Sequence, residues 1–476
     1  MSRQRIIKPV IIKGALIVLF LICTFAQASY VPNQVIVKFK PEISMETRSE
    51  IISQNNCSMT KQCSLTDLYL IQIDESQSPE QMVMAYENLD AIDYAELNYN
   101  FRIFLVPNDE LYFLQWNLHN QRYGGIHIED AWDIQTGDPN VIIAVLDTGI
   151  AYEDFGIYKK APDFAETKFV PGYDFVNNDS HPNDDQGHGT HVTGVIAVST
   201  NNNIGLAGIA FNCSIMPVKV IGDEGIGNVF DIVDGIYFAT NNNAKVINMS
   251  LGSENDSTAL RQAIEYAHSK DVTIICAAGN NFEEGNEFSY PAAYDRFCIA
   301  VGATRFDETR AYYSNTGTYI DIAAPGGDLN VDQNFDNNPD GIIQETFVDN
   351  PAVFNYWIGS GTSFAAPHVS AAAALLISNG ITKPDKVRLA LEESADDLGP
   401  QGWDVEYGWG LLNVTKAINY KITGDLTGDL IVNIDDLNIL TKNWLTVQGL
   451  SRETDFNNDG IIDFKDFAIL ADNWTK

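Results

Sequence analysis

The chain has 476 residues, of which 45% are hydrophobic, so it can bury one large core together with smaller modules. Acidic residues outnumber basic ones by 64 to 29, which gives a formal charge of -35. Such a field repels nucleic acids and anionic membrane surfaces, so we exclude both as partners. The charge suits a protein that works outside the cell or binds cations, although acidity can also serve solubility alone.

The first 28 residues have the three parts of a secretory signal. Four basic residues within positions 3–13 precede an apolar run over 15–25, and Ala26 and Ala28 place small residues at a cleavage position. The apolar run is short for a membrane span, so we expect cleavage after Ala28 rather than a retained anchor. The protein is therefore predicted to be secreted.

Residues 29–105 are predicted to form a small open-faced α/β sandwich. Met45–Gln54 is helix-like, and Ser78 followed by Pro79 is typical of a helix start. Three segments have the pattern of strands, with apolar and polar residues alternating in the first. These segments are 35–40, 68–73 and 92–99.

Six cysteines in a chain of this length do not predict a disulfide scaffold. Cys57 and Cys63 lie close together in sequence and could pair. Cys276 falls in an apolar run that indicates a buried strand, so a buried free thiol is expected there.

Residues 106–420 alternate repeatedly between strand and helix patterns. Four short apolar runs end at small or polar residues and predict buried parallel strands; they are 141–146, 244–249, 273–278 and 298–302. The fold class is a doubly wound, mostly parallel α/β sheet, which binds ligands beyond the carboxyl ends of its strands. The stretch 327–351 is rich in Asp and Asn and is expected to be an exposed loop.

Three residues at strand or helix ends have the types that serine hydrolysis needs. Asp147 follows the run 141–146, His188 opens a helix of small residues, and Ser363 begins another helix. A serine hydroxyl needs an adjacent base, a neutral imidazole can take and return the proton, and a carboxylate fixes the imidazole's tautomer. The helix start at Ser363 offers backbone N–H groups to a developing oxyanion, and Asn280 can supply a second donor.

Each of these motifs alone has another interpretation. Asp147 can simply start a turn. His188 and His191 form a zinc-like pair, but the glutamate of a zinc peptidase motif is absent, so His191 is expected to pack. Residues 361–365 lack the last glycine of an esterase elbow, and the chain order Asp, His, Ser differs from that of the esterase fold. The combination therefore favours a peptidase over a zinc site or an esterase.

The motifs resemble the signature segments of the subtilase family over about residues 106–417. They are Asp147-Thr-Gly, His188-Gly-Thr-His, Ser250-Leu-Gly, Ala278-Gly-Asn280 and Gly361-Thr-Ser-Phe-Ala-Ala-Pro-His. The resemblance implies a subtilisin-like fold and a monomeric peptidase that hydrolyses peptide bonds in protein substrates. It also implies that Ser250, Leu251 and Gly252 pair with the substrate backbone as an extra strand, with Gly225 and Gly227 on its other side. Strand addition reads the backbone more than side chains, so broad specificity is expected.

Residues 29–105 resemble the inhibitory prodomain of subtilases. Such prodomains assist folding and then occupy the active site with their C-terminal strand, which here falls around residues 93–102. The resemblance implies an autoprocessed zymogen cleaved between Phe101 and Leu111. The alternative is a stable N-terminal domain without an inhibitory role.

One departure from the family pattern follows the nucleophile. Subtilases often carry methionine at that position, whereas this chain has Phe364. Phenylalanine cannot form a sulfoxide, so we expect the enzyme to tolerate peroxide.

The last residues, 421–476, contain an internal duplication in which an acidic loop precedes an apolar helix that ends in Asn-Trp. Calcium loops place oxygen ligands at positions 1, 3, 5, 7, 9 and 12. In the first repeat these positions are Asp425, Thr427, Asp429, Ile431 (by its carbonyl), Asn433 and Asp436. In the second they are Asp455, Asn457, Asp459, Ile461 (by its carbonyl), Asp463 and Asp466. The first repeat is expected to bind Ca2+ more weakly than the second, because Thr427 and Leu430 depart from the pattern of a calcium loop.

This duplication resembles a dockerin, a small all-α calcium-binding module. Dockerins imply a cohesin-bearing scaffold or surface protein as partner. The usual recognition positions hold Ile434-Asp435 and Phe464-Lys465 rather than small hydroxyl residues, so the existence of a cohesin partner stays open. The alternative for such acidic loops is simple solvation.

Two further calcium sites are suggested within 106–420 by resemblance to other subtilases. One comprises Asp174, Asn177 and Asp179, ahead of the His188 motif, and the other comprises Asn202, Ile204 and Leu206. Either can be an ordinary turn, because Asn and Asp favour turns.

The sequence thus predicts a signal peptide (1–28), a prodomain (29–105), a subtilisin-like peptidase (106–420) and a dockerin (421–476), with Ca2+ as cofactor. The protein is expected to be secreted and held at a cell surface or in a complex through the last module. The main rival is a catalytically inactive, surface-displayed binding protein with the same fold.

Overall fold

The computed structural model describes residues 30–74, 77–100, 105–119, 124–427 and 431–442, together with 444, 454, 456 and 461–474. The predicted signal peptide and the expected calcium ligands Asp429, Asp455, Asn457 and Asp459 lie outside the described residues. The described residues from 105 to 421 belong to one compact unit, the peptidase unit. Among the helices that are described, none is long and apolar enough to cross a membrane.

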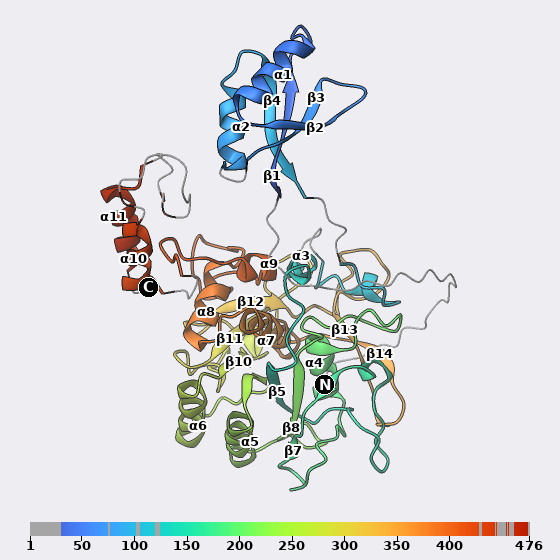
Figure 1. Ribbon diagram of the computed structural model, residues 1–476. Helices are drawn as coiled ribbons and strands as arrows, with labels where there is room; N and C mark the ends of the chain where they lie inside the picture. Colours follow the sequence, from blue (N-terminus) through green and yellow to red (C-terminus); the bar gives the residue numbers. More distant parts are fainter. Residues whose placement is uncertain are drawn as a thin grey trace. The chain divides into compact units, whose positions relative to one another are not determined.

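A sheet of parallel strands runs through the peptidase unit (Figure 1). The strand order is β12-β11-β10-β9-β5-β8-β6, and β7 also pairs with β8. The strands are β5 (Ile142–Asp147), β6 (Lys168–Phe169), β7 (Tyr173–Asp174), β8 (Ser214–Lys219), β9 (Ala244–Met249), β10 (Thr273–Ala277), β11 (Ile299–Thr304) and β12 (Ile322–Pro325). All four predicted apolar runs are parallel strands of this sheet, which confirms the predicted fold class.

Helices cover both faces of the sheet because alternate residues of each buried strand point to opposite sides. In β5, Ile143 and Val145 pack in the core that contains α4 (His188–Ala197) and α7 (Thr362–Ser378). Ala144 and Leu146 pack in the core that contains α5 (Val229–Asn241) and α6 (Thr258–Ser269). The remaining helices of the unit are α3 (Ile128–Trp132), α8 (Pro384–Glu393) and α9 (Val414–Ile418), with short 3-10 turns at Tyr112–Leu114, Pro162–Phe164 and Phe282–Glu284.

The stretch expected to be an exposed loop contains a buried hairpin. Strand β13 (Ile342–Thr346) pairs antiparallel with β14 (Asn355–Gly359), and all five residues of β13 are buried. The expectation was wrong here, because the polar composition of the flanking residues hid a strand that packs against α4. Residues on either side of β13, such as Asp332 and Asp349, are exposed.

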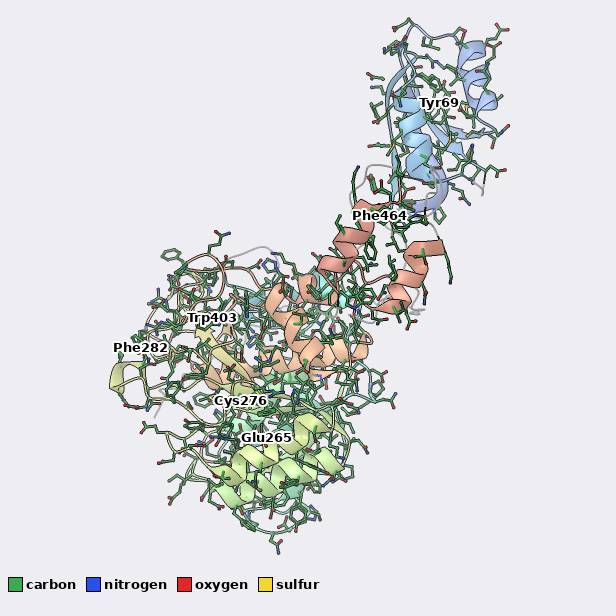
Figure 2. The ribbon with its side chains drawn as sticks, turned by 90° about the vertical axis from the view of Figure 1, so that its left-hand side faces the viewer. Tyr69, Glu265, Cys276, Phe282, Trp403 and Phe464 are labelled. Carbon is green, nitrogen blue, oxygen red and sulfur yellow. The ribbon has the colours of Figure 1, made fainter. Side chains whose placement is uncertain are left out.

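The N-terminal sandwich has an antiparallel sheet with the order β2-β3-β1-β4. Its elements are β1 (Tyr30–Phe39), α1 (Met45–Gln54), β2 (Ser58–Gln62), β3 (Leu68–Gln72), α2 (Pro79–Glu87) and β4 (Ile92–Tyr99). Its core includes Val35, Tyr69 and Tyr86, and Tyr69 is labelled in Figure 2. The predicted elements are present, and Ser78 is the N-cap of α2, although its hydroxyl bonds to the Glu80 side chain rather than capping the helix.

The cysteine that was expected to be buried and free is both. Cys276 lies inside the peptidase unit with no exposed surface (Figure 2). The possible pairing of Cys57 with Cys63 is not borne out, because both are free thiols. Cys57 instead donates to the backbone oxygen of Asn55 at 3.2 Å.

The C-terminal segment contains two helices with matching surroundings, α10 (Ile434–Lys442) and α11 (Phe464–Asp472). Val432 and Leu440 are buried in the first repeat, and Ile462 and Leu470 are buried at the corresponding positions of the second. Val432 also forms a parallel bridge with Trp474, two residues beyond the end of α11. The duplication seen in sequence is therefore repeated in packing.

Candidate active site

Asp147 and His188 meet at the ends of two neighbouring elements. Asp147 ends β5 and is buried, and its Oδ1 lies 2.7 Å from Nδ1 of His188, the first residue of α4. The same oxygen accepts the backbone N–H of Thr148 at 2.8 Å. Gly189 permits this close approach, because a Cβ there would lie 2.2 Å from the Gly149 oxygen and 3.1 Å from the Asp147 Cβ.

The Asp147 carboxylate raises the pKa of the His188 imidazole beside it. Burial lowers the pKa of His188, but the charge and hydrogen bond of Asp147, together with the charge of Asp184, raise it by more, so that the pKa lies above its ordinary value. An imidazole held in this way can accept a proton while the carboxylate stabilises the resulting cation.

A second buried acid, which the sequence reasoning missed, joins β5 to the start of α4. Asp184 Oδ1 accepts the Thr148 hydroxyl at 2.8 Å and the Gly187 N–H at 2.9 Å. Its Oδ2 accepts the N–H and the hydroxyl of Thr190 at 2.9 and 2.6 Å. Thr148 Oγ1 in turn accepts the Gly189 N–H at 2.9 Å. These bonds fix the two elements that carry Asp147 and His188.

Ser363 lies in the first turn of α7 and is half-buried. Its hydroxyl donates to the backbone oxygen of Ser250 at 3.1 Å rather than to His188. The Ser250 hydroxyl in turn donates to the backbone oxygen of Ser363 at 2.8 Å. The next residue, Phe364, has its ring centre 5.6 Å from that of His188. Hydrogen bonds between nucleophile and base are often loose before substrate binds, so this resting geometry is compatible with a nucleophilic serine.

The Asn280 side chain is fixed through its oxygen. Asn280 Oδ1 accepts the backbone N–H and the hydroxyl of Thr362, each at 2.9 Å. The amide nitrogen Nδ2 of Asn280 lies 3.4 Å from the position that a Cβ on Gly361 would occupy. Asn280 is exposed and lines the same pocket as Ser363, so its N–H groups are available to an oxyanion there.

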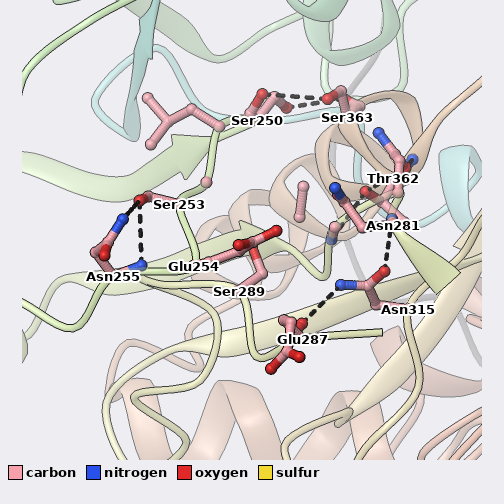
Figure 3. Close-up of a pocket in the computed structure, with 15 residues that line it drawn as sticks. Ser250, Ser253, Glu254, Asn255, Asn281, Glu287, Ser289, Asn315, Thr362 and Ser363 are labelled. Carbon is pink, nitrogen blue, oxygen red and sulfur yellow. Dashed lines mark hydrogen bonds between the residues drawn. The ribbon is translucent and has the colours of Figure 1, made fainter. Parts of the chain in front are cut away.

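A pocket of about 440 Å3 opens beside Ser363 (Figure 3). All three residues expected to pair with the substrate backbone line it, namely Ser250, Leu251 and Gly252. The other lining residues are Ser253, Glu254, Asn255, Ala277, Gly279, Asn280, Asn281, Glu287, Ser289, Asn315, Thr362 and Ser363. Ser253 and Tyr290 exchange two backbone hydrogen bonds of 2.9 and 2.8 Å, which fix one wall.

Gly225 and Gly227 lie in an exposed turn ahead of α5, outside this pocket. Gly227 bridges to Ile221. A Cβ on Gly225 would lie 3.9 Å from the amide nitrogen of Gln186, so the turn borders the segment that leads into His188.

His191 is packed, as expected. It is buried and its Nε2 lies 3.3 Å from the Trp357 oxygen. Burial lowers the pKa of His191 to about 3, so the ring is neutral. The Phe364 ring lies 4.3 Å from it between ring centres.

The two suggested calcium loops of the peptidase unit differ in their surroundings. At the first, Asp174 accepts the backbone and side-chain N–H groups of Asn177 at 2.8 and 2.9 Å and bridges to Asp179. The turn is therefore held by hydrogen bonds between its own residues. Across the residues that the structure describes, no three His, Cys, Asp or Glu side chains are gathered as a metal cluster.

At the second loop, two buried acids that the sequence reasoning missed face Asn202–Leu206. Asp163 accepts the Leu206 N–H at 2.9 Å and the Asn202 side chain at 3.3 Å, and Asp109 accepts the Asn202 N–H at 3.2 Å. Burial raises the pKa of Asp163 to about 8, and the charge of Glu345 adds to the rise. Both acids are buried, no ion pair within the described part of the chain involves either, and buried carboxylates beside loop oxygens fit a hard cation. No local pattern marks Asp109 and Asp163, because they lie far from the loop in sequence.

The C-terminal loops end in two acids with the same contacts. Asp436 accepts the backbone N–H groups of Leu426, Thr427 and Asn433 at 2.8, 2.9 and 2.7 Å. Asp466 accepts those of Phe456 and Asp463 at 2.8 and 2.9 Å. Both acids are fully buried, so each expected twelfth-position ligand is already turned into its own loop.

Comparison with known proteins identifies the class. The family model "Subtilase family" matches residues 138–410, and "Fervidolysin N-terminal prodomain" matches residues 24–98. The chain is 34% identical over 397 residues to "Thermophilic serine proteinase" of Bacillus sp. (strain AK1), covering 83% of this chain and 89% of that protein. It is 36% identical to "Thermitase" of Thermoactinomyces vulgaris, covering 66% of this chain and 99% of that protein.

A solved structure agrees with the sequence matches. A protease from Pseudoalteromonas arctica PAMC 21717 matches with a TM-score of 0.57 and 32% identity, over 66% of this chain and 99% of that one. The chain belongs to the subtilase family of serine peptidases and has a subtilisin-like α/β fold with an N-terminal prodomain.

Proposed function

We propose that this chain is a secreted serine endopeptidase whose catalytic triad is Asp147, His188 and Ser363. The observation that carries the proposal is the 2.7 Å contact of His188 with Asp147, with the ring of Phe364, the residue after Ser363, 5.6 Å from that of His188 between ring centres. The order and roles of these residues match those of a serine-hydrolase triad.

The chemistry proceeds through an acyl-enzyme. His188 Nε2 takes the proton of the Ser363 hydroxyl as its oxygen attacks the scissile carbonyl, while Asp147 stabilises the imidazolium. The Asn280 amide and the backbone N–H at the start of α7 donate to the oxyanion. The imidazolium then protonates the leaving amine, and water, activated by the same imidazole, releases the acid product and restores the serine.

The substrate is proposed to bind as an added strand along Ser250, Leu251 and Gly252, with Gly225 and Gly227 on its other side. The position of the first three residues in the pocket wall supports this arrangement. Because an added strand is recognised through its backbone, protein and peptide substrates of varied sequence are expected, and the peptidase is expected to act as a monomer.

Autoprocessing is proposed to convert the chain from a zymogen to the mature enzyme. The prodomain match over residues 24–98 supports this, and cleavage is expected between Phe101 and Leu111. The basic and apolar pattern of the first 28 residues supports export. N-terminal sequencing of the mature enzyme tests both steps at once.

Calcium binding is proposed for the C-terminal repeats and for the peptidase unit. The twice-repeated geometry of Asp436 and Asp466 supports a dockerin that binds Ca2+ through Asp425, Asp463 and the other loop positions, and that attaches to a cohesin-bearing protein. In the peptidase unit, Asp109 and Asp163 would join the oxygens of the Asn202–Leu206 loop. The turn of Asp174, Asn177 and Asp179 is the weaker candidate.

Casein hydrolysis separates this function from its rivals. The enzyme is expected to degrade casein, to be blocked by a fluorophosphonate, and to lose activity in Ser363→Ala. An inactive binding protein would leave casein intact. An esterase would hydrolyse small esters but leave casein intact.

A further inference from the structure

Residues 332–340 form a turn in which every second residue carries a side-chain oxygen. These residues are Asp332, Asn334, Asp336, Asn338 and Asp340. The spacing equals the first, third, fifth, seventh and ninth positions of a calcium loop. This turn lies between β12 and β13 of the peptidase unit, and it is separate from the loops discussed above.

Side-chain oxygens of the turn accept backbone N–H groups of the same turn. Asp332 accepts the N–H groups of Asp336 and Asn337 at 3.2 and 3.1 Å. Asn334 Oδ1 accepts the Asp336 N–H at 2.9 Å, and Asp336 Oδ1 accepts the Asn338 N–H at 2.7 Å. Asn337, the sixth residue, has a φ of 70°, the left-handed conformation that glycine supplies at this position of a calcium loop.

The ninth residue is a buried acid with an unused oxygen. Asp340 is 1% exposed, and its Oδ2 accepts the backbone N–H of Gln333, which turns the carboxylate back toward the start of the turn. Among the residues that the structure describes, none donates a hydrogen bond to its Oδ1. Burial raises the pKa of Asp340 to about 6, and the charges of Asp332 and Asp336 add to the rise. A buried carboxylate oxygen without a partner is costly, and a cation would satisfy it.

The basic side chain in this region is engaged elsewhere. Arg305 binds Asp307 at 2.8 Å and lies 3.6 Å from Asp328. Among the residues that the structure describes, no ion pair joins a Lys, Arg or His to Asp332, Asp336 or Asp340. The described residues therefore give these three carboxylates no ion-pair partner.

We propose that residues 332–340 bind a calcium ion through the side-chain oxygens of Asp332, Asn334, Asp336 and Asp340 and an oxygen of Asn338. The donor set mixes carboxylate and amide oxygens, as Ca2+ prefers, and water completes the six to eight ligands that it takes. The ion is expected to draw the three carboxylates together, since they do not form a gathered cluster without it.

Such an ion would hold a hairpin that touches both catalytic helices. Asp340 leads into β13, where the Thr346 hydroxyl donates at 2.5 Å to the oxygen of Gly187, the residue before His188. The partner strand β14 ends at Gly359, just ahead of Ser363. Loss of the ion is therefore expected to loosen the peptidase unit near its active site.

The test uses the full chain carrying Ser363→Ala, so that self-digestion cannot occur. In this background Asp332→Asn/Asp336→Asn is expected to bind one calcium ion fewer per chain in equilibrium dialysis. Its midpoint of thermal unfolding is expected to fall below that of the parent in calcium but to equal it in EDTA. The matched control is Asp349→Asn, an exposed acid beyond β13, which should match the parent in every measurement.

A merely structural role would lower the unfolding midpoint in EDTA as well, with the calcium count unchanged. That result, or an unchanged count with an unchanged midpoint in calcium, would overturn the proposal.

Terbium luminescence supplies a local readout in the same background. Trp116 shares a small cavity with Asn334, Asp336 and Asn338, so it can sensitise Tb3+ bound in the turn. Tb3+ emission excited through tryptophan is expected to fall by the same amount in Trp116→Phe and in the double variant. Full emission in both variants would contradict the site.

A second inference comes from the charge of the pocket in Figure 3 and rests on the proposed peptidase function. Glu254 and Glu287 line the pocket on the side of Ser289, and no Lys, Arg or His is among its lining residues. Both glutamates are exposed, and neither takes part in an ion pair among the described residues. Gly252 and Gly279 line the pocket without side chains, and a Cβ on them would lie 2.4 Å from the Ser289 Oγ and 3.1 Å from the Ser289 Cβ, respectively.

We infer that this pocket prefers Lys or Arg as the substrate residue before the scissile bond. A long basic side chain can pass the glycine walls and bring its charge near the two carboxylates, whereas an aromatic ring would face mostly polar groups. This preference would narrow the broad specificity expected from backbone recognition alone.

Peptide amides that differ only in this residue test the preference. With Lys, Arg, Phe and Leu compared, the Lys to Phe ratio of kcat/KM is expected to exceed one and to fall roughly tenfold in Glu287→Gln or Glu254→Gln. Glu283→Gln, an exposed neighbour that does not line the pocket, should leave the ratio unchanged. Preference for Phe or Leu would refute this inference alone, whereas cleavage of none of the peptides would count against the peptidase function itself.

Discussion

Two groups of buried acids in the peptidase unit are satisfied in different ways. Asp147 and Asp184, beside His188, accept their hydrogen bonds from neighbouring backbone and side-chain groups. Asp163 and Asp340 accept theirs from loop groups, namely Asn202, Leu206 and Gln333, and burial raises their pKa values to about 8 and about 6. The difference indicates that the first group positions the side chains proposed to be catalytic, whereas the second group is suited to hold cations.

Removal of the Asp147 charge should have the largest effect on catalysis among the following changes. Asp147→Asn is expected to lower kcat by about 10^4, because the imidazole loses its orienting carboxylate. Since that carboxylate raises the pKa of His188, its loss should let His188 remain neutral to lower pH. The acidic limb of the kcat/KM profile should therefore move to lower pH. A pH profile with an unmoved limb would argue against the pairing.

The oxyanion donor should matter less than the triad. Asn280→Ala is expected to lower kcat by about 10^2 to 10^3, with little change in KM, because the donor acts on charge that develops in the transition state. Steady-state kinetics on a peptide amide measures this. A change confined to KM would assign Asn280 to ground-state binding instead.

Asp184 is expected to affect stability, because it positions the segment around His188 and takes no part in the proposed reaction. Asp184→Ala would leave the N–H groups of Gly187 and Thr190 buried without an acceptor, at an expected cost of about 2–3 kcal/mol in the free energy of unfolding. Denaturant unfolding in the Ser363→Ala background checks this, with the exposed Asp223→Asn as control. Equal stability of the two variants would show that Asp184 does not stabilise the start of α4.

The smallest effect on basal activity is expected at Phe364. Its ring contacts His188 and His191 and contains no oxidisable sulfur. Phe364→Met should keep most activity but become sensitive to dilute peroxide, whereas the parent should resist it. Residual casein hydrolysis after peroxide treatment compares the two, and rapid inactivation of the parent would contradict the prediction.

Sequence patterns were informative where the residues that define a feature are neighbours in the chain. Asp147, His188, Asn280 and Ser363 each stand in a short motif at a strand or helix end, and a parallel sheet brings such ends to one edge. The buried strands were found because their apolar runs are continuous.

Other features depend on distant partners and left no local signal. The five residues of β2 are all exposed, so they show no alternation. Strand β13 is buried only because it packs beside α4, and Asp109 meets its partners across a long sequence separation. The unused oxygen of Asp340 depends on the folded surroundings, which composition alone cannot reveal.

The most direct test of the central claim is the site of covalent labelling by a fluorophosphonate. Peptide mapping of the labelled, mature enzyme is expected to find one adduct on Ser363, formed in the parent and abolished in His188→Ala. A label on a different residue, or casein hydrolysis that persists with Ser363 unlabelled, would contradict the assignment of the triad.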